Sequence, residues 1–206
     1  MAVLHSSPTA QDLDDEMRDL RARVDRLAAE LDETRAYAAR LEALAHEDSL
    51  TGLLNRRGFL RDLTRAVAFG SRYDAEAALL LVDLDQFKPV NDRFGHPMGD
   101  RALRHVADIL RRNVRASDSV GRLGGDEFAL VIWQVDEAAA QQKARAIEDM
   151  VAATPLAVGG NALLLGASVG VTFLRGDDTA DEALARADRA MYARKRERQA
   201  MMSGVS

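Results

Sequence analysis

Apolar residues at the start of the chain follow the seven-residue pattern of a coiled coil. From Leu13 to Ala45 they recur in alternating steps of four and three residues, and neither Gly nor Pro interrupts them. The stripe is narrow and predicts a dimeric, parallel coiled coil over residues 12–47. The alternative is a helix that packs on its own domain, which usually has a wider apolar face. The seam positions are Leu13, Met17, Leu20, Val24, Leu27, Leu31, Thr34, Ala38, Leu41 and Ala45.

After residue 47 the pattern changes to short apolar runs separated by polar turns. We expect a buried strand in "EAALLLVDLD", a hairpin in "GRLGGDEFALVIW", and a strand pair that turns at "VGGNA" and returns through "LLLGASVGVTFL". Helices are expected over about residues 57–70, 137–153 and 179–197, with a short and a longer helix between 87 and 115. This alternation predicts an α/β (α+β) sandwich with a mostly antiparallel central sheet. The globular domain would follow the coiled coil and span residues 48–198. Residues 1–11 and 199–206 would be flexible ends.

Composition narrows the class of protein. A net charge of −5 argues against a coat for nucleic acid polymers. The chain has no cysteine, which excludes disulfides and thiolate metal sites and fits a cytoplasmic location. Its apolar run at residues 77–82 is far shorter than the about 20 residues that span a bilayer. We therefore expect no membrane span. The N-terminus lacks the basic start and apolar core of a signal peptide, so none is expected there.

Acidic residues gather where two predicted strands end. Asp83 and Asp85 close the buried strand, and Asp126 and Glu127 occupy the hairpin tip. If the hairpin lies beside that strand, Glu127 comes near Asp83. Two carboxylates with no His or Cys nearby suit a hard cation such as Mg²⁺. Asp85 is expected to cap the next helix, which leaves Asp83 free for such a role. The alternative for the hairpin is a simple Gly-Gly turn with solvated acids.

The hairpin tip also has two glycines, Gly124 and Gly125. They leave no side chain between the backbone and an incoming triphosphate. With the acids they form "GGDEF", which resembles the signature of the diguanylate cyclase domain. The blocks "DSLTGLLNRR", "VDLDQFKPVNDRFGHPMGD" and "ASVGV" are similar to the other motifs of this family, in order and spacing, from about Asp48 to Lys195.

The resemblance implies a fold like nucleotidyl cyclases and polymerase palms, and it implies a reaction. Two GTP molecules would condense to cyclic di-GMP and two pyrophosphates across a homodimer in which each subunit holds one GTP. Asp83, the backbone carbonyl of Leu84 and Glu127 would hold two Mg²⁺ ions, or Mn²⁺ in their place. Asp126 would help to deprotonate the attacking 3′-hydroxyl, and Lys88 would contact the phosphates.

The same resemblance implies that Asn91 and Asp100 read guanine, with Leu53 and Leu103 lining its pocket. A carboxylate accepts hydrogen bonds from the two adjacent donors on the guanine edge, whereas adenine presents an acceptor there. The alternative for Asp100 is an N-cap of a helix that starts near Arg101.

Arg115 and Asp118 form an Arg-x-x-Asp string five residues before the glycines. Family members with this string bind their own product there and are inhibited by it. Arg115 offers a fork for phosphate or a guanine edge, and Asp118 offers an acceptor pair. The alternative is an ion pair at a helix end.

The C-terminal segment departs from the family. A lysine that faces the phosphates is usually followed by Gly-Arg-Asn, whose arginine does the same. Lys195 matches the lysine, but Gln199 stands at the arginine position. Arg196 or Arg198 is a possible substitute, and a solvated basic tail is the alternative.

The coiled coil fits the reaction that the resemblance implies. One domain holds one GTP and needs a second copy facing it, and a parallel coiled coil brings two domains together. The coil also offers a surface for a regulatory protein. Alternatives to the enzyme are a receptor for GTP or cyclic di-GMP, a scaffold, and a cyclase of another dinucleotide. Trp133, on a predicted strand, is interpreted as a core residue rather than a ligand platform.

Overall fold

The computed structural model describes residues 10–73, 75–158 and 161–203, and the chain divides into two compact units with the boundary between Leu44 and Ala45. Residues 1–9 and 204–206, which belong to the ends expected to be flexible, lie outside the described residues. The side chain of Leu13, the first seam position, is also outside them.

The first unit is formed by the long helix α1 (Ala10–His46). Its heptad side chains are exposed in a single chain: Leu20 retains 48% and Leu27 62% of their accessible surface. Met17, Val24, Leu31 and Leu41 are exposed as well. A row of exposed large apolar residues along one helix face is typical of a surface that pairs with another helix.

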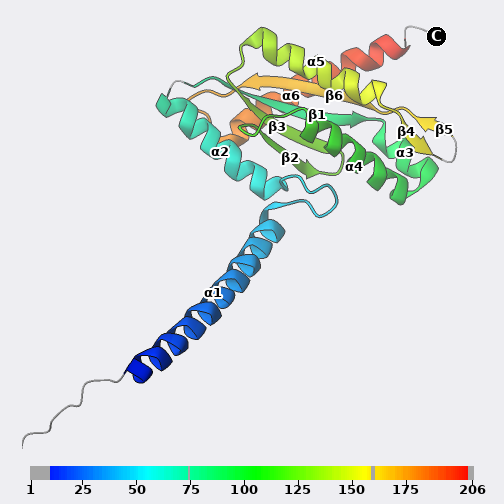
Figure 1. The fold of residues 1–206 in the computed structure, drawn as a ribbon. Coiled ribbons are helices and arrows are strands. Elements are labelled where there is room, and N and C mark those ends of the chain that lie inside the picture. Colours follow the sequence, from blue (N-terminus) through cyan, green and yellow to red (C-terminus); the bar gives the residue numbers. More distant parts are fainter. Residues whose placement is uncertain (1–9, 74, 159–160, 204–206) are drawn as a thin grey trace, which may run out of the picture. The chain divides into compact units, whose positions relative to one another are not determined.

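A four-stranded sheet forms the centre of the second unit (Figure 1). The strand order is β2 (Ser119–Gly124), β3 (Glu127–Trp133), β1 (Ala77–Asp85) and β6 (Gly166–Phe173). Each neighbouring pair is antiparallel, which confirms the predicted sheet.

Helices cover both faces of this sheet. Leu80 and Val82 of β1 pack toward one apolar cluster, whereas Leu79 and Leu81, their neighbours along the strand, pack toward the other. Because both faces are buried, β1 is an unbroken apolar run. The first cluster takes in α3 (Phe87–Phe94), α4 (His96–Arg112) and α5 (Glu137–Ala153), and the second α2 (Arg56–Tyr73) and α6 (Ala180–Ser203). No helix in the described part of the chain is both long and apolar enough to cross a membrane.

The C-terminal strands differ from the prediction. The short strands β4 (Leu156–Val158) and β5 (Asn161–Leu163) pair with each other as a separate two-stranded sheet. β6, expected as the second strand of that pair, instead joins β1 in the main sheet. Gly170 on β6 lets α6 pack closely on this strand, because a Cβ there would lie 2.2 Å from the backbone nitrogen of Met191 on α6. The helix α6 also continues to Ser203, so residues 199–203 are helical rather than tail.

Candidate active site

The two acidic strand ends lie side by side. In the β1–β3 register Asp83 is the direct partner of Glu127, as the sequence predicts. The buried apolar residues of β1 fix that register, because a slip by one residue would turn the strand's core side chains over. Next to this pair, the backbone N–H of Leu84 donates to the carbonyl oxygen of Asp126 at 3.3 Å. The edge of the sheet therefore carries two neighbouring carboxylates with a third acid in the adjoining turn.

The turn between β2 and β3 depends on its glycines. Gly124 has φ +147° and Gly125 has φ +50°, and a Cβ on either would meet no atom within 4 Å. The positive φ angles therefore require glycine here, and the space above the turn is open. Arg122 stabilises the turn, since its Nη2 donates to the carbonyl of Gly125 at 2.7 Å and its Nη1 pairs with Asp48 at 3.2 Å. The sequence analysis missed Arg122, whose signal is a lone basic residue within an apolar strand.

Lys195 of α6 reaches the carboxylate pair. Its Nζ lies 2.5 Å from Oδ1 of Asp83. Asp83 and Asp85 are two residues apart on β1, so both side chains point to the sheet face that α6 covers. Lys195 and Arg198, three residues apart on α6, therefore contact Asp83 and Asp85 respectively. Burial acts to lower the pKa of Lys195, but its contact with Asp83 outweighs that effect and raises the pKa. Lys195 is therefore a fixed positive charge at the site.

The acids at this edge are unfavourably placed as free anions. Burial raises the pKa of Asp83; Lys195 opposes this shift, and the charges of Asp126 and Asp85 add to it. Burial also raises the pKa of Glu127, and the nearby charge of Asp83 adds to the rise. A divalent cation would relieve this concentration of negative charge.

The donor set fits a hard cation. Asp83 and Glu127 offer carboxylate oxygens, and Leu84 offers a backbone carbonyl at the same strand end. Mg²⁺ favours such oxygen ligands and takes others from water and substrate phosphates. Within the described residues no group of three or more His, Asp or Glu side chains is arranged around one metal position. Any ion bound here would therefore depend on the carbonyl and on ligands from outside the protein.

Asp85 has a different role from the predicted one. The residue before α3 is Gln86, in a left-handed conformation with φ 56°, and no side chain caps the helix. The N-cap interpretation of Asp85 is therefore wrong. Its carboxylate instead accepts from the Ser168 hydroxyl at 2.7 Å and from Nε of Arg198 at 3.2 Å. These contacts join the end of β1 to β6 and α6.

A buried acid that the sequence analysis missed lies behind this contact. Glu148 of α5 is 2% exposed, and Arg194 donates to it from Nη2 at 2.6 Å. Arg198 Nη1 lies 3.4 Å from the same carboxylate, and the backbone N–H of Val169 on the edge strand β6 donates to it at 3.0 Å. The sequence signal is a Glu beside the buried stripe that includes Ala144 and Ile147. Glu148 thus ties α6 to α5 and to the edge of the sheet.

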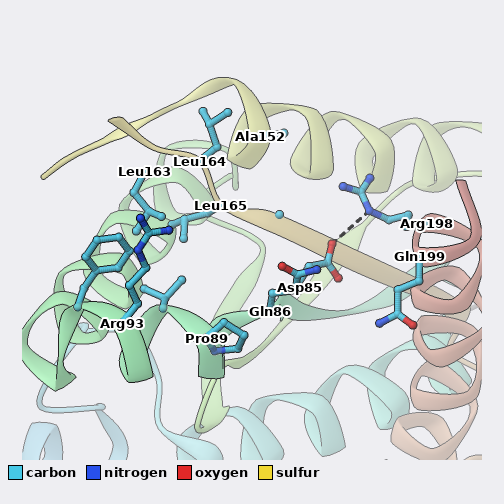
Figure 2. A pocket seen from close by; sticks show the side chains of 13 residues that line it. Asp85, Gln86, Pro89, Arg93, Ala152, Leu163, Leu164, Leu165, Arg198 and Gln199 are labelled. Atoms are coloured by element: carbon cyan, nitrogen blue, oxygen red, sulfur yellow. Dashed lines mark hydrogen bonds and ion pairs between the residues drawn. The ribbon is translucent and has the colours of Figure 1, made fainter. Parts of the chain in front are cut away.

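A cavity of about 410 Å³ opens beside the Asp85–Arg198 pair (Figure 2). Its wall is mostly apolar, with Pro89, Leu165 and their neighbours on one side and Gln199 on the other. Arg198, the possible substitute for the family arginine, lines this cavity and is engaged by two acids, Asp85 and Glu148. Arg196, the other candidate, is exposed.

The residues expected to read guanine come from two consecutive helices. Asn91 lies on α3 and its side chain packs on α4, since a Cβ on Gly99 would come within 1.9 Å of its Oδ1. Asp100 is half-buried within α4. That helix begins at His96 after Gly95, so Asp100 is not an N-cap and the alternative interpretation is wrong.

Three more residues were expected at the nucleotide site. Leu53 and Leu103 are both 3% exposed and belong to the same apolar cluster. Lys88 is exposed on the first turn of α3. The leucines thus serve the core in this structure, and the lysine is accessible.

The Arg-x-x-Asp string forms a tight turn. One oxygen of Asp118 accepts from the backbone N–H of Arg115 at 2.9 Å, and the other from that of Trp133 at 3.3 Å. The side chain of Arg115 is exposed. Asp118 therefore braces the backbone that presents Arg115, which differs from the side-chain ion pair considered as the alternative.

Known proteins resemble this chain over nearly the whole of its globular domain. The family profile described as "Diguanylate cyclase, GGDEF domain" matches residues 45–201. Diguanylate cyclase DgcP of Pseudomonas aeruginosa is 33% identical over 180 residues, which cover 86% of this chain and 27% of DgcP. The chain spans well under half the length of the curated relatives that it matches.

Two solved structures share the fold. The coiled coil and GGDEF domain of DgcB from Caulobacter crescentus, in complex with c-di-GMP, gives a TM-score of 0.79 at 28% identity, covering 86% of this chain and 95% of that one. Diguanylate cyclase SiaD in complex with its activator SiaC, from Pseudomonas aeruginosa, gives 0.71 at 34% identity, covering 91% and 74%. This chain belongs to the family of diguanylate cyclase GGDEF domains.

Proposed function

We propose that this chain is a diguanylate cyclase, which condenses two GTP molecules into cyclic di-GMP and releases two pyrophosphates. The observation that carries the proposal is the register that makes Asp83 and Glu127 neighbours, with Lys195 against Asp83. Each 3′-hydroxyl would attack the α-phosphate of the other GTP, losing its proton as the bond to pyrophosphate breaks.

We assign two Mg²⁺ ions, or Mn²⁺ in their place, to Asp83, Glu127 and the carbonyl of Leu84. Such ions supply Lewis-acid stabilisation of charge on the attacking oxygen and the leaving pyrophosphate. Asp126, in the adjoining turn, is placed to accept or relay the proton of the hydroxyl. Lys88 and Lys195 would bind the phosphates, which the open space over Gly124 and Gly125 admits.

Guanine recognition is assigned to Asn91 and Asp100, in a pocket that Leu53 and Leu103 would line. Asp100 is half-buried, so an adenine base, which presents an acceptor to it, would leave a partly desolvated carboxylate unpaired. This asymmetry favours GTP over ATP.

Catalysis requires two domains, and α1 is the proposed means of pairing them. Its exposed stripe fits a parallel coiled coil with a second copy of the chain, which raises the effective concentration of one domain near the other. SiaD was crystallised with an activator protein. A regulatory protein acting on this chain is therefore a further proposal.

Arg115 and Asp118 are proposed to bind cyclic di-GMP and so to limit its synthesis. The related DgcB was crystallised with c-di-GMP. In this chain the braced turn presents an exposed guanidinium, which suits a phosphate or a guanine edge.

The test is incubation of the purified protein with GTP and Mg²⁺, followed by mass spectrometry of the nucleotides. Cyclic di-GMP with two equivalents of pyrophosphate is the expected result. Binding of GTP or cyclic di-GMP without turnover would make the protein a receptor instead. A different dinucleotide would overturn the guanine assignment, and a stable protein partner without turnover would favour a scaffold.

A further inference from the structure

Three aromatic side chains form a cluster away from the carboxylate pair. Phe69 and Tyr73 lie one turn apart on α2, with ring centroids 4.6 Å apart, and Trp133 lies at the end of β3. Phe69 meets Trp133 edge to face with centroids 5.4 Å apart. Phe69 is 49% and Tyr73 60% exposed, and Trp133 is partly exposed. Trp133 is thus a core residue only in part, and ring surface in this aromatic cluster is open to solvent.

The aromatic cluster adjoins the turn that presents Arg115. The backbone N–H of Trp133 donates directly to Asp118, whose other oxygen binds the backbone N–H of Arg115. The helix α2 contacts the neighbouring strand β2 directly after this turn, where the Ser119 hydroxyl donates to Asp62 at 3.3 Å. A planar ring surface and an exposed guanidinium therefore share one end of the sheet.

That end is opposite to the proposed catalytic edge. Trp133 is the last residue of β3 and Glu127 is the first. At about 3.3 Å per residue a strand of this length separates its ends by roughly 20 Å. A ligand on the aromatic cluster would therefore not occupy the place of a nucleotide at Asp83 and Glu127.

We propose that the aromatic cluster stacks a guanine base of cyclic di-GMP while Arg115 binds a phosphate or the edge of a base. The inference rests on the proposed function because it takes the product as ligand. A cyclic dinucleotide combines flat bases with an anionic backbone, so it needs both an aromatic face and a cation. The aromatic cluster supplies the face, and Arg115 with Arg72 on the last turn of α2 supplies the positive charge.

The chain contains its own reporter, because Trp133 is its one tryptophan. Titration of the full chain with cyclic di-GMP, followed by tryptophan emission and by calorimetry, should give a saturable emission change. Phe69→Ala and Phe69→Leu should weaken the affinity about tenfold, whereas Phe69→Tyr, which keeps the ring, should retain it. Because Phe69→Leu preserves apolar bulk, it separates loss of stacking from loss of folding. Tyr192→Ala, at an exposed aromatic of α6, is the matched control and should bind as the parent does.

The outcomes separate this inference from the proposed product site. If Arg115→Ala weakens binding but the Phe69 variants stay within twofold of the parent and the emission is unchanged, stacking is refuted and the product site stands. Weakening by the Phe69 variants alone would support stacking and remove Arg115 from the site. Unchanged binding in both sets of variants would overturn both.

Discussion

Asp83 on β1 and Glu127 on β3 are direct cross-strand partners, so their carboxylates project from the same face at the same end of the sheet. Lys195 contacts Asp83 from the helix that covers this face. Burial raises the pKa of both acids and neighbouring carboxylates add to the rise, while Lys195 opposes it at Asp83. A divalent cation bound here would offset the electrostatic cost of placing ionised carboxylates side by side. The Asp83–Glu127 pairing therefore links the fold to the proposed metal-dependent chemistry.

Substitution Glu127→Gln should weaken metal binding at the site while leaving the fold intact. The amide lacks the charge that holds a divalent ion, so Mn²⁺ affinity, measured by electron paramagnetic resonance, should fall at least about tenfold and cyclic di-GMP synthesis about a hundredfold or more. Glu76→Gln, at an exposed site just before β1, is the control and should leave both unchanged. Parental Mn²⁺ affinity in the Glu127 variant would remove this residue from the metal site.

The same variant should be more stable than the parent when metal is absent. The raised pKa of Glu127 means that the folded chain holds this proton more tightly than the unfolded chain does. Ionisation therefore costs stability above the raised pKa, and the cost vanishes below the ordinary carboxyl value of about 4.3. In EDTA at pH 7 we expect Glu127→Gln to raise Tm by about 1–3 °C, and the gain should shrink as pH falls toward about 4. A lower Tm at pH 7 would contradict the electrostatic argument.

Glu148→Gln should destabilise the domain. The substitution would remove the buried negative charge that forms ion pairs with Arg194 and with Arg198. Breaking such a buried network typically lowers the free energy of unfolding by about 3 kcal/mol. For a chain of this size we expect a fall in Tm of about 6–12 °C by calorimetry. Asp149→Asn removes the same charge from the next, exposed residue and should change Tm by less than about 2 °C. Equal effects of the two substitutions would mean that the ion pairs contribute no specific stability.

Asp100→Ala should reduce the preference for GTP over ATP. Removal of the carboxylate takes away the acceptor for guanine and the penalty against adenine, so the ratio of affinities should fall about tenfold or more. Competition binding with GTP and ATP measures this ratio directly. Asp92→Ala, at an exposed acid on α3, should leave it unchanged. A parental ratio in Asp100→Ala would assign base selection to other residues.

Aspartates on the coiled-coil seam should separate the dimer. Leu20→Asp with Leu27→Asp places two charges on the apolar stripe, which should yield monomers by light scattering and reduce cyclic di-GMP synthesis at least about tenfold at assay dilution. Ala22→Asp with Ala29→Asp adds the same charge at the outward heptad position and should leave the dimer intact. A monomeric seam variant with parental activity would show that α1 is not what pairs the domains.

Features that depend on local periodicity and on motif were predictable from the residues alone. Heptad spacing predicted α1, and the alternation of helices with strands and hairpins predicted the antiparallel sheet. The acids at the ends of two apolar runs predicted that Asp83 and Glu127 would meet. These predictions held because periodicity reports which side of an element is buried, and the neighbours within an element follow from geometry alone.

The partners of the long polar side chains, in contrast, depend on how distant segments pack together. Asp85 looked like a helix cap, but Arg198 and Ser168 bring their donors to it from segments more than 80 residues away in the chain. Packing between distant segments likewise brings two arginines of α6 to Glu148 and places Phe69 against Trp133. A local pattern cannot fix such partners, because they depend on which faces the core brings together and on the burial that makes an unpaired charge costly.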